Sequence, residues 1–423
     1  MTDFMIIVFV IYLLFMAFGY WMKFLNLNYL KRNGHQIPAP FEGYIDGELL
    51  KRTSDYIFEH SRFGYIESIF NNVLVLGFLF GGILARYNQW IHSFDFPFIL
   101  AGILFFFFLD LAATIIDIPF DLYSTFKIEN KYGFNTTTPR LWIADFFKSF
   151  VISVVLLLIT GGVGFWLIQI SPHLWWLWLW AFFLLFSLFV MYISPYVIEP
   201  LFNKFTPITE YEGLEEKIKQ MFQKIDIKIS RVFQIDASKR SKHSNAYFTG
   251  IGKVKRIILY DTLLQKLSHD EIMAVLAHEA GHWKKKHILK QILLSEAMGF
   301  VSIYISFRIL QTDWLTRMFQ IQPETLFAKL VLLGFIGSLL SFPLAPISSY
   351  FGRKREYEAD QMAVDLMGSP DAIVSALIKL SKDNLSNLHP HPLYAKLYYS
   401  HPPIVQRLER LKQLKPQEQE PAA

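Results

Sequence analysis

Residues 276–283 read Leu-Ala-His-Glu-Ala-Gly-His-Trp, and this stretch sets the expectation for the rest of the chain. Residues four apart lie on one face of a helix, so His278 and His282 can reach the same ion. Glu279 lies beside them, where it can take a proton from water at that ion. This spacing is the His-Glu-x-x-His arrangement of zinc metallopeptidases. The alternative is a pair of surface histidines on an exposed helix.

The flanking residues predict that this motif sits on a helix. Ser268 is followed three residues later by Glu271, a capping box that satisfies two free backbone N–H groups at a helix start. Apolar residues then recur with helical spacing, and no proline interrupts them. Gly281 costs helix stability, which indicates close packing or the approach of a ligand at that point.

The composition indicates a membrane protein. Apolar residues make up 53% of the 423 residues and charged residues only 18%, against about 25% in a typical soluble domain. The net charge of +5 requires no nucleic acid partner, because basic residues that flank membrane spans give the same balance. The chain has no cysteine, which excludes disulfides, thiolate metal ligands and a cysteine nucleophile.

Seven hydrophobic runs are each near the ~20 residues needed to cross a bilayer. They lie at 4–22, 66–85, 97–118, 150–170, 174–198, 290–311 and 326–349. We expect the first to be a retained span and not a signal peptide, because Asp3 stands where a basic cluster would be and no small-residue cleavage site follows. Asp110 and Asp117 interrupt the third run.

The positions of lysine and arginine predict the orientation. Segment 23–62 has six of them and segment 119–149 has four, whereas 86–96 and 312–325 have one each. Because such residues concentrate in cytosolic loops, seven spans place the N-terminus outside and the hydrophilic segments in the cytosol. The predicted division is five spans in 1–198 with cytosolic loops 23–62 and 119–149, a catalytic segment 199–289, spans six and seven in 290–350, a second catalytic segment 351–413, and a disordered tail 414–423.

Segment 199–289 is expected to contain a small sheet before the motif helix. An amphipathic helix is predicted at about 210–224, followed by extended runs at 231–236, 244–249 and 254–260. Gly250 and Gly252 supply a hairpin turn between the last two runs. Metallopeptidases use such a sheet to hold substrate as an added strand. The alternative is a plain structural hairpin.

A catalytic zinc needs three protein ligands and one open position. A third histidine in the compact pattern would fall at Ile288, so the metzincin arrangement is excluded. The next acidic candidates are Glu356, Glu358 and Asp360. Glu356 and Asp360 share a helix face, so we assign Glu356 as the ligand and Asp360 as the acceptor that orients a ligand histidine. Glu358 points away and is expected to be solvated, and a merely charged helix start beside the membrane is the alternative for the whole stretch.

The chain resembles the CAAX prenyl proteases of type I, which are integral-membrane zinc endopeptidases. The resemblance covers most of the chain. It depends on the motif with Trp283 and on four further stretches, which are 119–134 (PFDLYSTFKIENKYGF), 244–250 (SNAYFTG), 356–360 (EYEAD) and 399–403 (YSHPP).

The resemblance implies roles for individual residues. His278, His282 and Glu356 would bind one zinc ion, and Glu279 would be the general base. Asn245 and His401 would steady the oxyanion, and the strand around Ala246 and Tyr247 would pair with the substrate backbone. Without the resemblance, a His before Pro-Pro is more often a loop residue that opens a helix.

The family also implies seven spans around a large intramembrane chamber. Polar groups at membrane depth usually face an interior cavity, which would explain Asn71, Asn72, Asp110 and Asp117. Ordinary hydrogen bonds between helices are the alternative for these four residues.

The expected fold class is a mainly α, polytopic membrane protein with a zincin-like α+β catalytic domain on the cytosolic side. The expected function is zinc-dependent hydrolysis of peptide bonds in peptide or protein substrates, prenylated ones included. Two rivals remain, a quality-control protease for non-prenylated membrane proteins and a seven-span receptor or transporter with a structural zinc. The expected location is the endoplasmic reticulum membrane in a eukaryote and the inner membrane in a bacterium.

Overall fold

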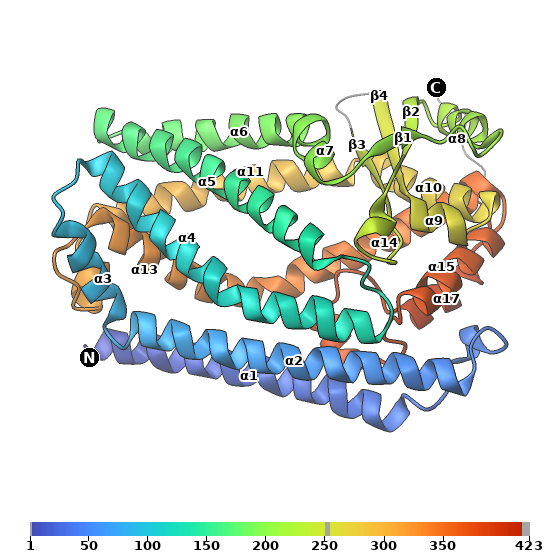
Figure 1. Cartoon of the computed structure of the whole chain (residues 1–423), viewed down its shortest axis with the longest axis horizontal. Coiled ribbons are helices and arrows are strands. Elements are labelled where there is room, and N and C mark those ends of the chain that lie inside the picture. The colour runs from blue at the N-terminus through green and yellow to red at the C-terminus, as the bar shows by residue number, and fades with distance from the viewer. Residues whose placement is uncertain (1, 250–253, 417–423) are drawn as a thin grey trace.

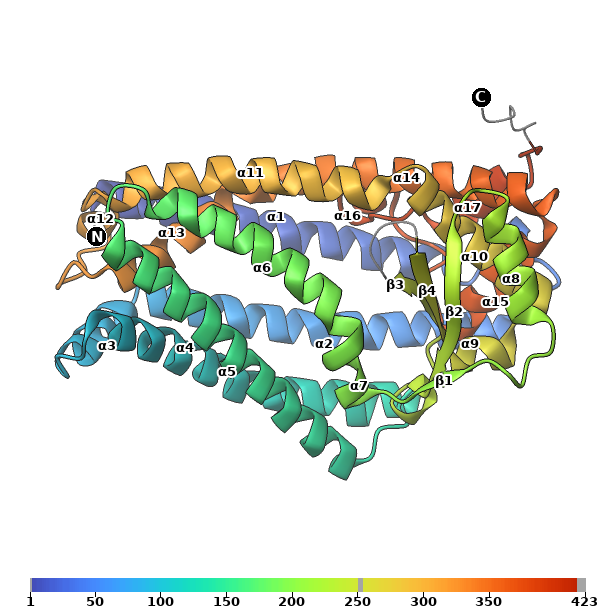
Figure 2. The same ribbon diagram turned by 90° about the horizontal axis from the view of Figure 1, so that it is seen from above.

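The computed structural model describes residues 2–249 and 254–416 of the chain. Long helices run along the molecule, and a small sheet with shorter helices gathers at one end (Figures 1 and 2). We call this end, which holds the sheet (205–260), the motif helix and the C-terminal helices, the catalytic end. The chain is mainly helical with an α+β part, as predicted.

Six helices or continuous helix pairs are long and apolar enough to cross a membrane. They are α1 (Asp3–Asn33), α4 with η2 (Phe98–Tyr123, Ser124–Glu129), α5 (Pro139–Ile170), α6 with α7 (Trp175–Val197, Glu199–Phe202), α11 (His287–Leu310) and α13 with η4 and α14 (Leu326–Ser341, Phe342–Leu344, Ala345–Met367). A seventh exists if α2 (Gly47–Leu79) and α3 (Ile83–His92), which meet at a 58° bend, count as one broken span. The bend falls at Gly82, whose φ of +78° favours glycine.

The helices extend past the predicted runs at the catalytic end. The segment Leu326–Met367 has 42 residues, which at about 1.5 Å per residue is roughly twice the thickness of the hydrocarbon core. The helix therefore continues out of the membrane and carries residues 356–360 into the catalytic end. The helix connections 34–46 and 130–138, which are parts of the predicted cytosolic loops 23–62 and 119–149, lie at this same end, opposite the N-terminus (Figure 1).

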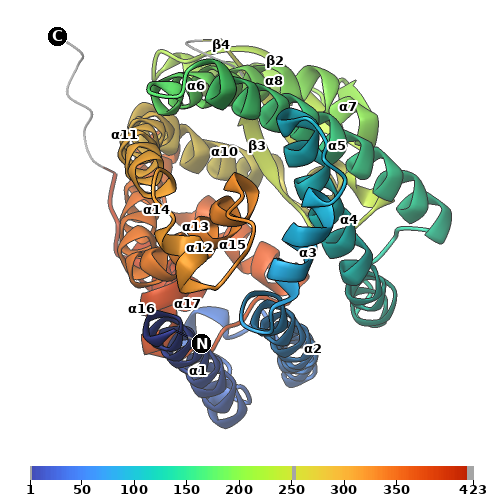
Figure 3. The same cartoon turned by 90° about the vertical axis from the view of Figure 1, so that its left-hand side faces the viewer.

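Viewed along the long axis, the helices form a ring (Figure 3). In the most apolar window of each span only 0% to 11% of the residues are buried. A helix inside a solid bundle buries a wide stripe, so this low burial fits helices that contact their neighbours edge to edge. The ring is the arrangement that an enclosed chamber needs, and the chamber itself stays a prediction.

Two of the four polar residues at membrane depth form hydrogen bonds between helices. Asn72 accepts one from the Tyr12 hydroxyl and donates one to Tyr20, each at 2.7 Å. Asp110 accepts one from Ser153 at 3.1 Å. These bonds support ordinary hydrogen bonding between helices as the role of Asn72 and Asp110. Asp117 is exposed.

The sheet has the strand order β1-β2-β4-β3. Its strands are β1 (Phe205–Pro207), β2 (Lys228–Ile235), β3 (Ala246–Thr249) and β4 (Val254–Tyr260). β1 and β3 pair antiparallel with their neighbours, and β2 and β4 run parallel. The three predicted runs are therefore strands, β1 was not predicted, and the turn at Gly250 and Gly252 lies outside the described residues.

Shorter helices gather at the catalytic end. They are α8 (Leu214–Gln223), α9 (Asp261–Lys266), α10 (His269–Lys284), α15 (Asp371–Asp383), α16 (Pro392–Tyr398) and α17 (Ile404–Leu411), with the 3-10 turns η1 (Ala39–Phe41) and η3 (Ala237–Lys239); α12 (Trp314–Met318) lies at the other end. Of these, α8, α9 and α10 contact the sheet, and α15, α16 and α17 pack on other helices. The predicted amphipathic helix at 210–224 is α8. Its apolar side joins α10, the sheet and α15 in one core. The predicted disordered tail is 414–423, and residues 417–423 of it lie outside the described residues.

Candidate active site and metal centre

The motif helix begins where the sequence predicts. The Ser268 side chain accepts from the backbone N–H of Glu271, and the Glu271 carboxylate accepts from the backbone N–H of Ser268 at 2.8 Å. Lys379 and Ser375 on α15 also donate to Glu271. Burial opposes the charge of this carboxylate, but these hydrogen bonds outweigh it and hold the pKa of Glu271 below its usual range. The capping box therefore also ties α10 to α15.

α10 crosses α14 very closely at Gly281. A Cβ atom on Gly281 would lie 2.8 Å from the Cα of Ala359, a contact that real Cβ atoms do not make. Ala277, Ala280 and Ala363 are fully buried along the same crossing. Small side chains thus let the two helices approach, which brings Glu356 opposite the two histidines of the motif.

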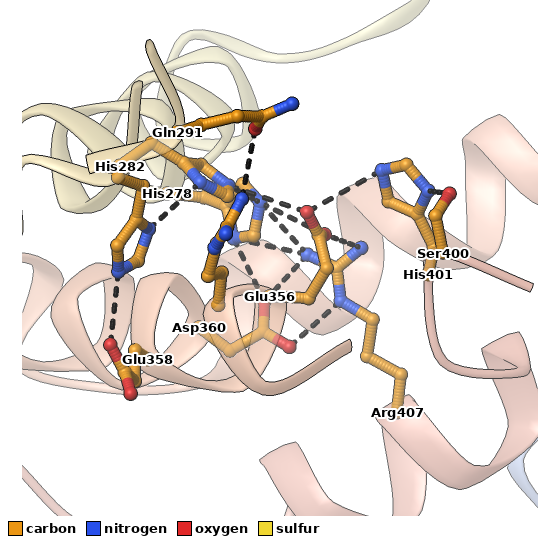
Figure 4. Close-up of polar contacts among 11 residues, drawn as sticks. His278, His282, Gln291, Glu356, Glu358, Asp360, Ser400, His401 and Arg407 are labelled. Atoms are coloured by element: carbon orange, nitrogen blue, oxygen red, sulfur yellow. Dashed lines mark hydrogen bonds and ion pairs between the residues drawn. The ribbon is translucent and has the colours of Figure 1, made fainter. Parts of the chain in front are cut away.

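The side chains of His278, His282 and Glu356 converge on one point (Figure 4). We call these three residues, which could hold a metal ion, the metal-ligand cluster. The Nε2 atoms of the two histidines are 3.3 Å apart, and each lies 3.4 Å from Glu356, His278 from its Oε2 atom and His282 from its Oε1 atom. A tetrahedral ion at about 2.0–2.1 Å from each ligand requires ligand atoms about 3.3–3.4 Å apart. The donor types and their spacing therefore fit zinc.

Two residues hold the His278 ring from behind. His278 Nδ1 lies 2.9 Å from Asp360 and 3.0 Å from the guanidinium of Arg407. Because the Asp360 carboxylate can only accept, this contact favours the tautomer in which His278 Nδ1–H donates to Asp360, and this leaves Nε2 to face the cluster. Arg407 in turn donates twice to Asp360, at 2.6 and 2.7 Å. Asp360 is 1% exposed, so this bidentate pair is buried.

A second chain of contacts supports His282. His287, at the start of α11, lies 3.1 Å from the Nδ1 of His282 and 2.9 Å from the carboxylate of Glu358. The prediction that Glu358 is only solvated is therefore wrong. Glu358 faces away from Glu356 on α14. Because α11 begins three residues after the end of α10, His287 lies between His282 and Glu358 and contacts both.

The cluster opens into a cavity of about 180 Å³. Its lining includes Ser244 and Asn245 just before β3, Ala246 at the start of β3, Glu279 and His401. The Nε2 of His401 lies 3.4 Å from Glu356, and its side chain is 69% exposed. The structure therefore brings Asn245, Glu279 and His401 together around the metal-ligand cluster.

β3 presents a free edge at this cavity. It pairs with β4 on one side, and no other strand in the described part of the chain pairs with its second side. The side chain of Tyr247 points to the opposite face of the sheet, where its hydroxyl donates to Glu199. Tyr247 can therefore offer only its backbone to a bound peptide, as an added-strand mode requires.

His243 anchors the residues before β3. Its ring stacks on Phe134 with 4.2 Å between centroids, and its nitrogens lie 2.9 Å from Asn384 and 3.4 Å from Glu129. The hydrogen bond with Glu129 raises the pKa of His243 despite partial burial. The stretch 119–134, which forms the end of α4, η2 and the following turn, thus supports the strand that lines the cavity.

Sequence reasoning missed Arg407, His287 and Ser244. The spacing between His401 and Arg407 matches no known motif. The available signal was that Arg407 lies on the buried side of α17 with Leu408 and Leu411. His287 is one residue before Ile288, the position at which the compact metzincin pattern would place a third histidine. Ser244 is the one buried side-chain oxygen without a hydrogen-bond partner in the described part of the chain.

Comparisons with known proteins agree with this geometry. Residues 26–204 match the model of the CAAX prenyl protease N-terminal domain with five membrane helices, and residues 209–415 match peptidase family M48. The chain is 34% identical over 397 residues to a CAAX prenyl protease 1 homolog of Arabidopsis thaliana, with 89% of this chain and 90% of the relative covered. A homolog from Oryza sativa subsp. japonica is also 34% identical, with the same coverage.

The architecture is similar to a solved structure as well. The crystal structure of S. mikatae Ste24p superposes with a TM-score of 0.90 at 29% sequence identity. The match covers 97% of this chain and 99% of that one. The likeness therefore includes both the ring of long helices and the catalytic end.

Proposed function

Because the chain belongs to peptidase family M48 and carries the membrane domain of the CAAX prenyl proteases, we propose that it binds zinc at His278, His282 and Glu356 and cleaves prenylated protein C-termini. The chain is a membrane metalloprotease by family. The identity of the metal, the roles of the site residues and the lipid on the substrate are the proposed parts. The observation that carries them is the convergence of three ligand atoms beside Glu279 and the free edge of β3.

Zinc in this cluster would supply Lewis-acid chemistry, since it polarises a carbonyl oxygen and makes water a stronger nucleophile at neutral pH. The buried pair of Asp360 and Arg407 would hold the His278 ring with Nε2 toward the bound ion, and His287 would do the same for the His282 ring. The ligand set has two neutral donors and one carboxylate, which leaves a net positive charge for the attraction of a carbonyl oxygen.

Glu279 would act as the general base. It would accept the proton of the attacking water and then deliver it to the amine that leaves, so the proton is returned within one cycle. Asn245 and His401 would donate hydrogen bonds to the oxyanion. The Oδ1 atom of Asn245 already accepts from the backbone of Ala246, and no described residue accepts from its Nδ2 group.

A prenylated substrate is proposed on the names of the relatives and on the position of the cluster. α11 begins three residues after α10 ends, and Glu356 lies on a helix continuous with a candidate span. The cluster therefore lies close to the membrane, where a lipid-modified tail is held.

The test uses purified protein in nanodiscs with a farnesylated peptide and the same peptide without the lipid. We expect cleavage of the farnesylated peptide, with loss of activity in chelator and recovery with zinc. Glu279→Gln should keep about one zinc per chain and lose at least about 10²-fold in turnover, the low end for general acid–base catalysis. The exposed Glu409→Gln on α17 is the matched control.

Two results would contradict the proposal. Turnover retained by Glu279→Gln would refute the base, and an equal rate for both peptides would favour a quality-control protease over prenyl-specific processing. A receptor or transporter with a structural zinc would cleave neither peptide.

We also propose that the catalytic end lies in the cytosol. The absence of cysteine makes this testable, because single cysteines can be introduced without a background signal. In intact bacterial cells that carry the protein in the inner membrane, Lys217→Cys on α8 should resist a membrane-impermeant maleimide until the membrane is opened, whereas Arg317→Cys on α12 should react at once. The reverse pattern would overturn the orientation.

A further inference from the structure

A second cavity, of about 630 Å³, lies on the opposite face of the sheet from the motif helix. On the α10 side, Val232, Ile257 and Leu259 are buried in the main core. The alternating residues Phe233 and Ile258 point the other way and line this cavity. The cavity is bounded by α5, the end of α6, α7 and η3, and it is separate from the metal-ligand cluster.

The lining of the cavity is strongly basic. Its cations are Lys148, Lys204, Lys239, Arg240 and Arg256. Two carboxylates face them, Asp236 in the lining and Asp145 directly behind it. A third, Glu199 on α7, lies on the same face of the sheet and accepts from the Tyr247 hydroxyl, so five cations stand against three anions.

Asp145 and Asp236 are already engaged as well. Asp145 accepts from Arg240 at 2.7 and 3.1 Å and lies 3.3 Å from Lys148. Asp236 accepts from the backbone N–H of Lys204 at 2.6 Å. No acidic side chain in the described part of the chain forms an ion pair with Lys204 or Lys239, and both residues are exposed. These two ammonium groups are available to an external anion.

Aromatic rings hold two further cations in place. The Arg256 guanidinium lies 4.4 Å from the ring centroid of Tyr196 and 5.7 Å from that of Phe233. Lys148 lies 5.6 Å from the Phe202 ring and donates to the carbonyl of Leu201 at 2.8 Å. A stacked guanidinium keeps its N–H edge for a planar or tetrahedral anion. The cavity is thus ordered before any ligand enters it.

The cavity lies at the end of a candidate membrane span. α6 and α7 form one apolar segment, Trp175–Phe202, with none of its most apolar window buried. Tyr192, Val197 and Leu201 next to the cavity are 51%, 52% and 47% exposed. An apolar wall that ends at a basic cavity matches a phospholipid, whose acyl chains and phosphate lie at these two depths.

We propose that this cavity binds the phosphate-bearing headgroup of an anionic phospholipid, with the acyl chains along α6. Lys204, Lys239 and Arg256 would contact the phosphate. The site does not depend on the proposed peptidase chemistry, since it is on the other face of the sheet.

The test compares full-length protein in detergent by native mass spectrometry during titration with phosphatidylglycerol or phosphatidylcholine. Wild type should retain the anionic lipid preferentially. Each lost cation should weaken binding about fivefold, so Lys204→Gln with Lys239→Gln should weaken it on the order of 25-fold. Lys217→Gln on α8 with Lys224→Gln directly after it removes the same charge away from the cavity and should leave binding unchanged. Arg256→Gln is measured separately, because its stacking also supports the fold.

Equal loss in the cavity double variant and in the α8 control would show a general charge effect and overturn the site. Unchanged binding in the cavity variant would overturn it as well. A third arm adds inorganic phosphate to protein without lipid. Stabilisation of the thermal midpoint by phosphate, with no preference between the two lipids, would assign the cavity to a soluble anion and overturn the lipid proposal.

Discussion

Asp360→Asn tests how the buried pair behind the metal-ligand cluster acts. The carboxylate accepts two hydrogen bonds from Arg407 at 2.6 and 2.7 Å and one from His278 at 2.9 Å. An asparagine of nearly the same shape has one acceptor oxygen and no charge, so Arg407 is left buried without its main counterion. The structure therefore predicts an effect on stability and a separate effect on metal binding.

The expected magnitudes come from the geometry. Removal of one partner from a buried ion pair costs about 3–5 kcal/mol of the free energy of unfolding. We expect the low end, because Glu356 still lies 3.5 Å from Arg407. Loss of the group that orients a metal-binding histidine lowers metal affinity about 10–100-fold. Zinc affinity is measured by competition with a chromogenic chelator, and stability by thermal unfolding in detergent with and without zinc.

The double variant Asp360→Asn with Arg407→Gln separates the two effects. It removes both members of the buried pair, although Glu356 also loses its contact with Arg407, so it should regain part of the stability but not the zinc affinity. Glu409→Gln is the control for loss of an exposed carboxylate. A zinc affinity within twofold of wild type in Asp360→Asn would refute the orienting role. A stability equal to wild type would refute the account of the buried pair.

Two further predictions concern the substrate strand. Ser244→Ala should leave the thermal midpoint unchanged or slightly higher, because the buried Ser244 hydroxyl has no partner among the described residues. If that hydroxyl forms a hydrogen bond with the substrate, the substitution should lower kcat/KM about 2–10-fold. An unchanged kcat/KM would show that Ser244 does not contact the substrate. The pKa of His243 is raised above about 6.5 by Glu129, so the stability from this contact is full below that pH and is lost as the pH rises through the folded pKa. His243→Gln should flatten the dependence of the thermal midpoint on pH between about 6 and 8, and an unchanged slope would contradict the linkage.

Much of the local structure followed from the sequence. The capping box at Ser268, the helical spacing of the motif and the apolar runs each depend on residues close together in the chain, and short-range rules describe such residues well. The choice of Glu356 over Glu358 needed only the angular period of one helix, and the structure brings Glu356 to the two histidines. The sequence also predicted that Asp360 lies on the same helix face as Glu356, because the two residues are four apart.

The contacts between distant segments needed the tertiary structure. Arg407 reaches Asp360 across 47 positions in the chain, and His287 joins Glu358 across 71 positions. No periodicity within either helix encodes these pairs, because each depends on how α10, α11, α14 and α17 pack. The sequence alone therefore determined which side chains can bind a metal and which segments are apolar enough for a membrane. Only the close crossing at Gly281 decided where those side chains meet, since helix packing depends on the shapes of both surfaces at once.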